Sequence, residues 1–199
     1  MNTCLFASKE CIAGCLKSSG RMPMGVKARI WKTQLLHSNR AQFLEFLRYD
    51  IGRLIRRARK LGLTPAVRLN GTSDLPWLSL QMSAEFPDVT FYDYTKIPKP
   101  YLRTRANYAI TFSYSGHNFA ETMSALAHGV NVAVVFDARR GTPLPESWHG
   151  YRVVDGDLHD LRFLDARGVV VGLRAKGKAR QQDSAFIVKT ELIQIALAA

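Results

Sequence analysis

Apolar residues recur at steps of three and four between residues 41 and 61, which is the pattern of an amphipathic helix. They are Phe43, Phe46, Leu47, Ile51, Leu54, Ile55 and Ala58. Ser38 and Asn39 offer a cap before this segment, and Gly62 follows it as a stop signal. The other face is basic and carries Arg48, Arg53, Arg56, Arg57, Arg59 and Lys60. We predict one long helix whose basic face either binds nucleic acid or another anion, or is simply solvated.

Beyond this helix, short β-branched runs alternate with helical ones, which predicts a parallel sheet covered by helices. The expected strands are 66–70, 89–93, 108–112, 131–136, 151–154 and 169–173, and the expected helices are 77–86, 119–127 and 186–197. Six strands in this order predict an α/β fold, either a parallel six-strand partial (β/α) barrel or an open doubly wound sheet. We expect a single domain over 1–199, with a cysteine-containing cofactor loop region in 1–40 and β/α units in 41–199. The stretches 97–101 and 141–150 are expected to be loops.

Composition narrows the class of protein. The chain has 199 residues, of which 47% are apolar, so it is not disordered by composition. Lys and Arg number 28 against 16 Asp and Glu, a formal charge of +12 that would attract nucleic acid or an anionic small molecule. No run approaches the ~18 apolar residues of a membrane span, and the first residues lack the apolar segment of a secretory signal. We therefore expect no membrane partner and a cytoplasmic location.

The three cysteines, Cys4, Cys11 and Cys15, all lie within the first fifteen residues with the spacing C-x6-C-x3-C. Thiolates are soft ligands that suit iron–sulfur clusters, Zn or Cu(I). Three of them can hold three corners of a [4Fe–4S] cluster and leave the fourth iron open. Zn would need a fourth ligand from a distant residue such as His37, His117 or His159. Three inert, core-packed thiols are the remaining alternative.

Polar residues follow nearly every predicted strand, and ligands of parallel α/β folds sit at the carboxyl ends of strands. The candidate cofactor-binding residues are Asn70, Gly71, Ser73, Asp74 and Ser113. The candidate catalytic or substrate-binding residues are Asp93, Lys96, Asp155, Asp157, His159, Arg174, Lys176 and Lys178. If all six strands are parallel, these side chains converge on one rim, although each segment taken alone is also typical of a turn or helix cap.

Two further patterns bear on the chemistry of this rim. Lys176, Lys178 and Arg180 suit a phosphate or carboxylate, while Asp155, Asp157, His159 and Asp160 offer oxygen and imidazole ligands for a hard metal. The chain contains no G-x-x-x-x-G-K-[ST], G-x-G-x-x-G, H-E-x-x-H or G-x-S-x-G motif. That argues against the common nucleotide hydrolases, dinucleotide dehydrogenases, zinc peptidases and α/β-hydrolases.

Several of these segments together resemble the uncharacterised phage proteins of the gene-product-88 type. The resemblance rests on the cysteine loop and on VRLNGTSDLPW (67–77), FYDYTK (91–96), NVAVVF (131–136), VDGDLHD (154–160) and VGLRAKGKAR (171–180). It covers nearly the whole chain. It implies a viral origin and hence the cytoplasm of the host cell, and it implies little about mechanism.

A looser resemblance is to radical S-adenosylmethionine enzymes, which carry a three-cysteine loop near the start of a partial (β/α)6 barrel. Their usual spacing is C-x3-C-x2-C and their loop follows a first strand, whereas here only three residues precede Cys4. The resemblance implies that the three cysteines ligate a [4Fe–4S] cluster whose open iron chelates S-adenosylmethionine. It also implies that Asn70, Ser73 and Asp74 contact this cofactor, and that Arg174 and Lys176 meet a carboxylate or phosphate.

Two functions are therefore carried forward. The first is an iron–sulfur enzyme of radical S-adenosylmethionine type that acts on a small anionic metabolite, a nucleotide or nucleic acid. The alternative is a nonenzymatic basic phage protein that binds nucleic acid through the face between Arg48 and Lys60, or binds a host partner. In that alternative a Zn ion or a cluster held by the cysteines is structural.

Overall fold

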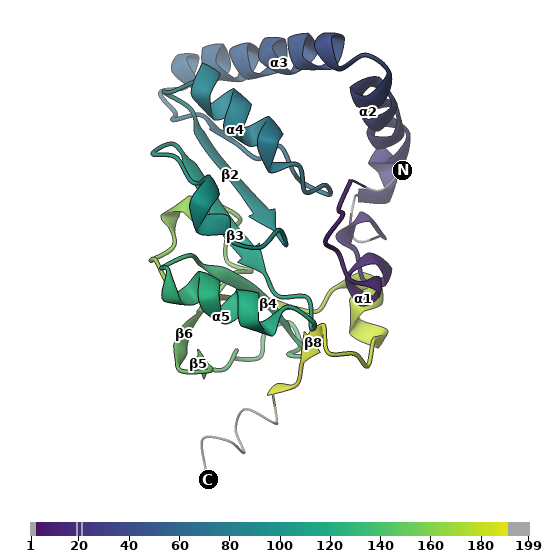
Figure 1. The fold of residues 1–199 in the computed structure, drawn as a ribbon, viewed down its shortest axis with the longest axis vertical. Coiled ribbons are helices and arrows are strands. Elements are labelled where there is room, and N and C mark those ends of the chain that lie inside the picture. Colours follow the sequence, from purple (N-terminus) through teal and green to yellow (C-terminus); the bar gives the residue numbers. More distant parts are fainter. Residues whose placement is uncertain (1–2, 19, 21, 191–199) are drawn as a thin grey trace.

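The computed structural model describes residues 3–18, 20 and 22–190. Its centre is an open sheet of eight strands in the order β1-β2-β3-β4-β7-β6-β5, with β8 paired to β4 (Figure 1). Every pairing is parallel except that of β5 with β6. The strands are β1 (Ala66–Val67), β2 (Thr90–Thr95), β3 (Tyr108–Ser113), β4 (Val132–Phe136), β5 (Ser147–Trp148), β6 (Tyr151–Asp155), β7 (Val170–Arg174) and β8 (Ile187–Val188).

The α-helices are α1 (Lys9–Ala13), α2 (Val26–Ser38), α3 (Arg40–Lys60), α4 (Pro76–Glu85) and α5 (Phe119–Ala127). Short 3-10 turns connect them, namely η1 (Leu16–Ser18), η2 (Met22–Gly25), η3 (Pro100–Arg103), η4 (Arg162–Leu164) and η5 (Gly177–Gln181). The long predicted helix is present as α3, with the Asn39 side chain accepting from the backbone N–H of Gln42 as its cap. It ends before Gly62, whose φ of 65° suits a glycine.

The core lies between one face of the sheet and the helices α3, α4 and α5. Ile110 of β3 packs with α3 and α4, and Phe112, two residues further along the same strand, packs with α5. Residues two apart in a strand point to the same side, so α4 and α5 cover the same face. Val132, Val134 and Phe136 of β4 are fully buried there, and each contributes about 1.5–3 kcal/mol through burial of its side chain. The opposite face is left for the site described below.

The structure departs from the predicted elements at several places. The first strand ends at Val67 and does not reach Asn70, whose backbone N–H donates to the side chain of Asp93 and not to a strand backbone. Where the helix over 186–197 was predicted to begin, the structure forms strand β8 instead. Strand β3 pairs only with the first half of β4, which leaves the end of β4 open to Ile187 and Val188. Residues 191–197 of that prediction lie outside the described residues. Helix α2 and strands β5 and β8 were not expected from the sequence.

A candidate cofactor site at the carboxyl edge of the sheet

A cavity of about 560 Å³ lies at the carboxyl ends of the parallel strands. Its strand-derived walls come from the ends of β2, β3, β4 and β7 and from the segments that follow β1 and β6. Ala133 and Val135 of β4 line it, whereas their neighbours in the strand face the helices. The cavity is thus on the side of the sheet that α4 and α5 leave open.

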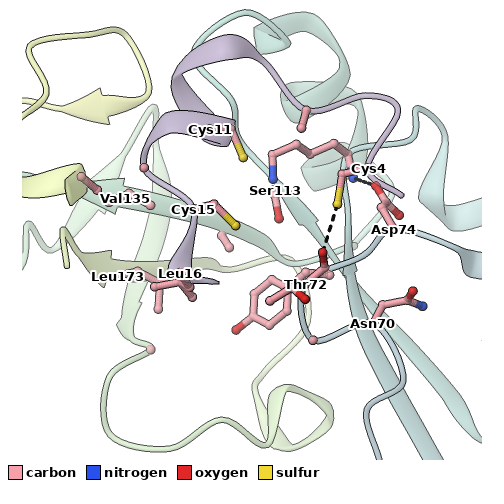
Figure 2. A pocket seen from close by; sticks show the side chains of 18 of the residues that line it. Cys4, Cys11, Cys15, Leu16, Asn70, Thr72, Asp74, Ser113, Val135 and Leu173 are labelled. Carbon is pink, nitrogen blue, oxygen red and sulfur yellow. Dashed lines mark hydrogen bonds between the residues drawn. The ribbon is translucent and has the colours of Figure 1, made fainter. Parts of the chain in front are cut away.

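All three cysteines line this cavity. Cys4 precedes α1, Cys11 lies in it, and Cys15 follows it, and each is partly buried and outside any disulfide. Ser8 caps the start of this helix, since its hydroxyl accepts from the backbone N–H of Cys11. Figure 2 shows the three sulfur atoms around one space, with Ser113 between them, Asp74 beside Cys4, and Thr72 joined to Cys4 by a hydrogen bond. The sequence predicted that these thiols belong to one site, and the fold brings them to one cavity.

Hydrogen bonds fasten the cysteine segment to loops that are distant in the sequence. The backbone N–H of Asp74 donates to the carbonyl of Thr3 at 2.8 Å. The Ser8 hydroxyl donates to the Ser115 carbonyl at 3.2 Å, and the Gln182 amide donates to the Glu10 carbonyl at 3.2 Å. The segment therefore crosses the carboxyl edge of the sheet (Figure 1) and closes one side of the cavity.

The surroundings of Cys4 disfavour ionisation of its thiol. Its thiol donates to the Thr72 carbonyl at a sulfur–oxygen distance of 3.6 Å. Burial raises the pKa of the Cys4 thiol from 9.0 to about 11, the carboxylate of Asp74 adds to the rise, and the ammonium of Lys96 opposes it. Cys4 is therefore a neutral thiol at pH 7 and must release a proton before it can bind a metal.

Asp93 does not line the cavity, contrary to the prediction from its place after the second strand. It is 2% exposed and lies on the helix side of the sheet, where it accepts from Ser79 of α4 and, at 3.3 Å, from the Tyr108 hydroxyl. It also accepts from the backbone N–H and the side-chain amide of Asn70, both at 2.9 Å. Adjacent residues of a strand point to opposite faces of the sheet, so Tyr94 points to the cavity and Asp93 does not.

Asn70 lines the cavity, but its side chain is already used within its own loop. Its oxygen accepts from the Ser73 hydroxyl at 2.8 Å and from the backbone N–H of Leu75 at 3.0 Å. Its amide donates to Asp93 and to the Leu75 carbonyl. Asn70 therefore shapes the loop that carries Gly71, Ser73 and Asp74 to the cavity wall.

Asp74 and Lys96 bring opposite charges to the same cavity wall. The Asp74 carboxylate accepts from the Thr95 hydroxyl and from the backbone N–H of Lys96, each at 2.8 Å. Both side chains line the cavity together with Ser113. Within residues 3–18, 20 and 22–190, the Lys96 ammonium forms no ion pair. It is thus a cation whose charge is available to a ligand.

The other cations of the cavity wall are paired with carboxylates. Arg174 donates to Asp155 at 2.9 Å and to Asp157 at 3.2 Å, and Lys176 donates to Asp157 at 2.6 Å. The hydrogen bond from Arg174 is the main reason that the pKa of Asp155 is lowered. Burial acts to raise the pKa of Asp157, but the hydrogen bonds from Lys176 and Arg174 outweigh it and the pKa is lowered. The expected carboxylate or phosphate ligand of Arg174 is therefore supplied by the chain itself.

Some predicted rim residues lie outside the cavity wall. Asp155 and Lys178 do not line it, whereas Asp157 and His159 do. The wall also contains Asp160, which the sequence offered as a hard-metal ligand, and two residues that sequence reasoning missed, Arg68 and Tyr94. Arg68 pairs with Asp160 at 2.7 Å and lies over the Tyr94 ring at 4.5 Å. No local pattern could pair Arg68 with Asp160, because these residues follow β1 and β6, which are not neighbours in the sheet.

A site for a single metal ion would need several ligand side chains close together. In the part of the chain that the structure describes, no group of three or more His, Cys, Asp or Glu side chains is arranged to hold one metal ion. This applies both to the cysteines and to the acidic segment from Asp155 to Asp160. A cluster differs from a single ion in that each cysteine binds a different iron, so its ligands stand farther apart.

The predicted basic face of α3 lies outside the cavity. Arg53, Arg56, Arg57 and Lys60 are exposed, and Arg48 is bound by the Glu85 carboxylate at 2.6 and 2.9 Å. None of these five residues lines the cavity. The basic face of α3 is therefore separate from the second basic group predicted from the sequence, of which Lys176 lines the cavity.

Comparisons with known proteins yield one match. The family model described as gene product 88 matches residues 1–190. Searches of curated proteins and of solved structures found no match. Among the residues that the structure describes, no helix is long and apolar enough to cross a membrane.

Proposed function

The chain belongs to the gene product 88 family of phage proteins, and we propose that it is an iron–sulfur enzyme of radical S-adenosylmethionine type. The observation that carries this proposal is the convergence of three thiols, one carboxylate and one available cation on a single cavity. Cys4, Cys11 and Cys15 would hold a [4Fe–4S] cluster, and the parallel sheet would serve as a partial (β/α) barrel. We place its action in the cytoplasm of the host cell.

The thiol set suits a cluster with one open iron. Three thiolates complete three of the four corners, and soft sulfur ligands select iron–sulfur clusters among the common metal groups. The cavity beyond the sulfurs leaves room for a second group, because it extends from the cysteine segment to Arg68 and His159. A structural zinc site, by contrast, is closed by four ligands around one ion.

The amino-acid end of S-adenosylmethionine carries an ammonium and a carboxylate. Asp74 and Lys96 present complementary charges on the same wall of the cavity as Cys4. The Asp74 carboxylate keeps lone pairs for an ammonium after accepting from Thr95 and Lys96. The Lys96 ammonium would meet the carboxylate, and the hydroxyls of Ser73 and Ser113 are within the same wall for the ribose.

The chemistry that such a cluster supplies, once reduced by an external one-electron donor, is cleavage of the sulfonium–C5′ bond to methionine and a 5′-deoxyadenosyl radical that takes a hydrogen atom from the substrate. The chain's own residues would bind and orient the cofactor and the substrate. Asp93 holds Asn70, and Asn70 holds the loop that presents Asp74. The cysteine segment covers the edge of the sheet and limits entry of water. The substrate, a small anionic metabolite, a nucleotide or nucleic acid, would enter at the wall formed by Arg68, Tyr94 and His159.

The test is product formation by the anaerobically reconstituted protein, supplied with S-adenosylmethionine and dithionite. We expect 5′-deoxyadenosine and methionine in equal amounts. Lys96→Met should raise the concentration of S-adenosylmethionine needed for half-maximal rate about tenfold or more, with iron content unchanged. The matched control is Lys178→Met, because Lys178 is exposed and outside the cavity wall. Protein that carries iron and sulfide but releases no 5′-deoxyadenosine would contradict the radical step.

A further inference from the structure

Most of the net charge of the chain is concentrated on helices α2 and α3. Residues 26–60 contain 10 Lys and Arg against 2 acidic residues, Glu45 and Asp50. Because the whole chain has a formal charge of +12, this segment supplies about two thirds of it. Figure 1 shows α3 along the top margin of the molecule, with α2 meeting one end of it at a steep angle and with the end of α4 below it.

One stripe along α3 combines aromatic and basic side chains. Phe46, Tyr49, Arg53, Arg56, Arg57 and Lys60 fall within about 100° around the helix axis and span about 21 Å of its length. Phe46 and Tyr49 are 47% and 64% exposed. Trp31 of α2, also exposed, stacks on Phe46 with ring centroids 6.3 Å apart and extends the stripe. We call these seven residues the α3 stripe.

The cations of the α3 stripe are not paired with carboxylates of the described residues. No ion pair in the described ranges involves Arg53, Arg56, Arg57 or Lys60. The nearest ring contact is Arg53 over Tyr49, at 5.9 Å. Asp50 lies at the margin of the stripe and is its closest acidic neighbour along the helix. Arg48, by contrast, is bound to Glu85 and stands outside the stripe.

We propose that the α3 stripe binds single-stranded nucleic acid. Arginine offers paired donors to phosphate oxygens, which explains its prevalence over lysine in the stripe. Exposed aromatic rings stack on unpaired bases and need no particular base sequence. An anionic membrane fits less well, because the apolar face of α3 is already buried in the core through Leu44, Ile51 and Ala58. This site is separate from the cavity and does not depend on the function proposed for it.

The experiment measures binding of a fluorescent oligothymidine of about 20 nucleotides to the full chain by anisotropy. With four phosphate contacts, the affinity should fall roughly fifty-fold between 50 and 200 mM salt. The double variant Arg53→Glu/Arg57→Glu should weaken binding about tenfold or more and flatten the salt dependence. The matched control is Arg140→Glu/Arg167→Glu, which reverses two exposed arginines outside the stripe and should change affinity far less.

The aromatic part of the proposal has its own test. Tyr49→Ala should weaken binding of the oligonucleotide between about fivefold and a hundredfold, and Tyr49→Phe should restore it. A duplex of the same length should bind less tightly. The triple variant with serine at the three cysteines should bind as the wild type does, which separates this site from the cavity.

Three results would overturn the proposal. One is equal loss of affinity in the two double arginine variants. Another is a duplex that binds as tightly as the single strand with no effect of Tyr49→Ala. The third is binding to phosphatidylserine vesicles without binding to the oligonucleotide, which would assign the stripe to a membrane surface.

Discussion

The carboxylate of Asp93 accepts two hydrogen bonds from Asn70, one from its backbone N–H and one from its side-chain amide, both at 2.9 Å. This pair joins the helix side of the sheet to the loop that presents Asp74 to the cavity. Buried polar groups of this kind fix one arrangement of a loop, because losing one partner leaves the other unsatisfied. The geometry of the cavity wall thus depends on a residue that does not touch the cavity.

Asp93→Asn should destabilise the protein by about 1–3 kcal/mol, because the Asn70 amide loses its acceptor. Burial raises the pKa of Asp93 above its ordinary 3.8. The folded state therefore holds this proton to a higher pH than the unfolded state, and the contribution of Asp93 to stability decreases as pH rises from 3.8 through the folded pKa. Urea unfolding across this range should show a deficit of the variant that shrinks with rising pH. A deficit that grows with pH would contradict this assignment.

In metal-free protein, Cys4 should react slowly with iodoacetamide. A pKa of about 11 in place of 9.0 lowers the thiolate fraction at pH 8 about 100-fold. The rate should rise tenfold per pH unit up to about pH 11, followed by mass spectrometry of the Cys4 peptide. Lys96→Met should slow the reaction further, because the Lys96 charge favours the thiolate, whereas Lys178→Met should not. Reaction at the rate of a thiol with a pKa of 9.0 would show that Cys4 is not buried as described.

Arg174→Gln should lower the free energy of unfolding at pH 7 by about 1–2 kcal/mol, since it leaves Asp155 and Asp157 without their shared partner. The folded pKa of Asp155 is lowered, so its contribution is present above 3.8 and is lost as pH falls through the folded value. The difference between wild type and variant should therefore vanish in acid. Arg167→Gln is the control and should have little effect at either pH, because Arg167 is exposed and forms no ion pair with the residues that the structure describes.

The parts of the fold that could be predicted are those with a strong local signal. The amphipathic pattern of α3 and the apolar run of β4 identified their elements within a residue or two, and α5 was predicted over the residues it occupies. Strands β5 and β8 are two residues each, too short for a periodic signal. Helix α2 has no buried residues, so no apolar stripe marks it in the sequence.

The candidate site shows the same division. Its location at the carboxyl edge followed from the parallel order of the strands, and Asp74, Lys96 and Ser113 are in its wall. The direction of a side chain at the end of a strand depends on register, which explains why Asp93 faces the helices. The pairing of Arg174 with Asp155 and Asp157 joins β7 to residues at the end of β6 and just after it. No local sequence pattern predicts this pairing.

The most direct test of the central claim is the iron and acid-labile sulfide content of the anaerobically reconstituted protein, with its absorbance spectrum. We predict about four irons and four sulfides per chain in the wild type, and none in the variant with serine at Cys4, Cys11 and Cys15. The single variants should each lose most of the cluster. A colourless protein that contains one zinc per chain, or a triple variant that keeps its iron, would contradict the account.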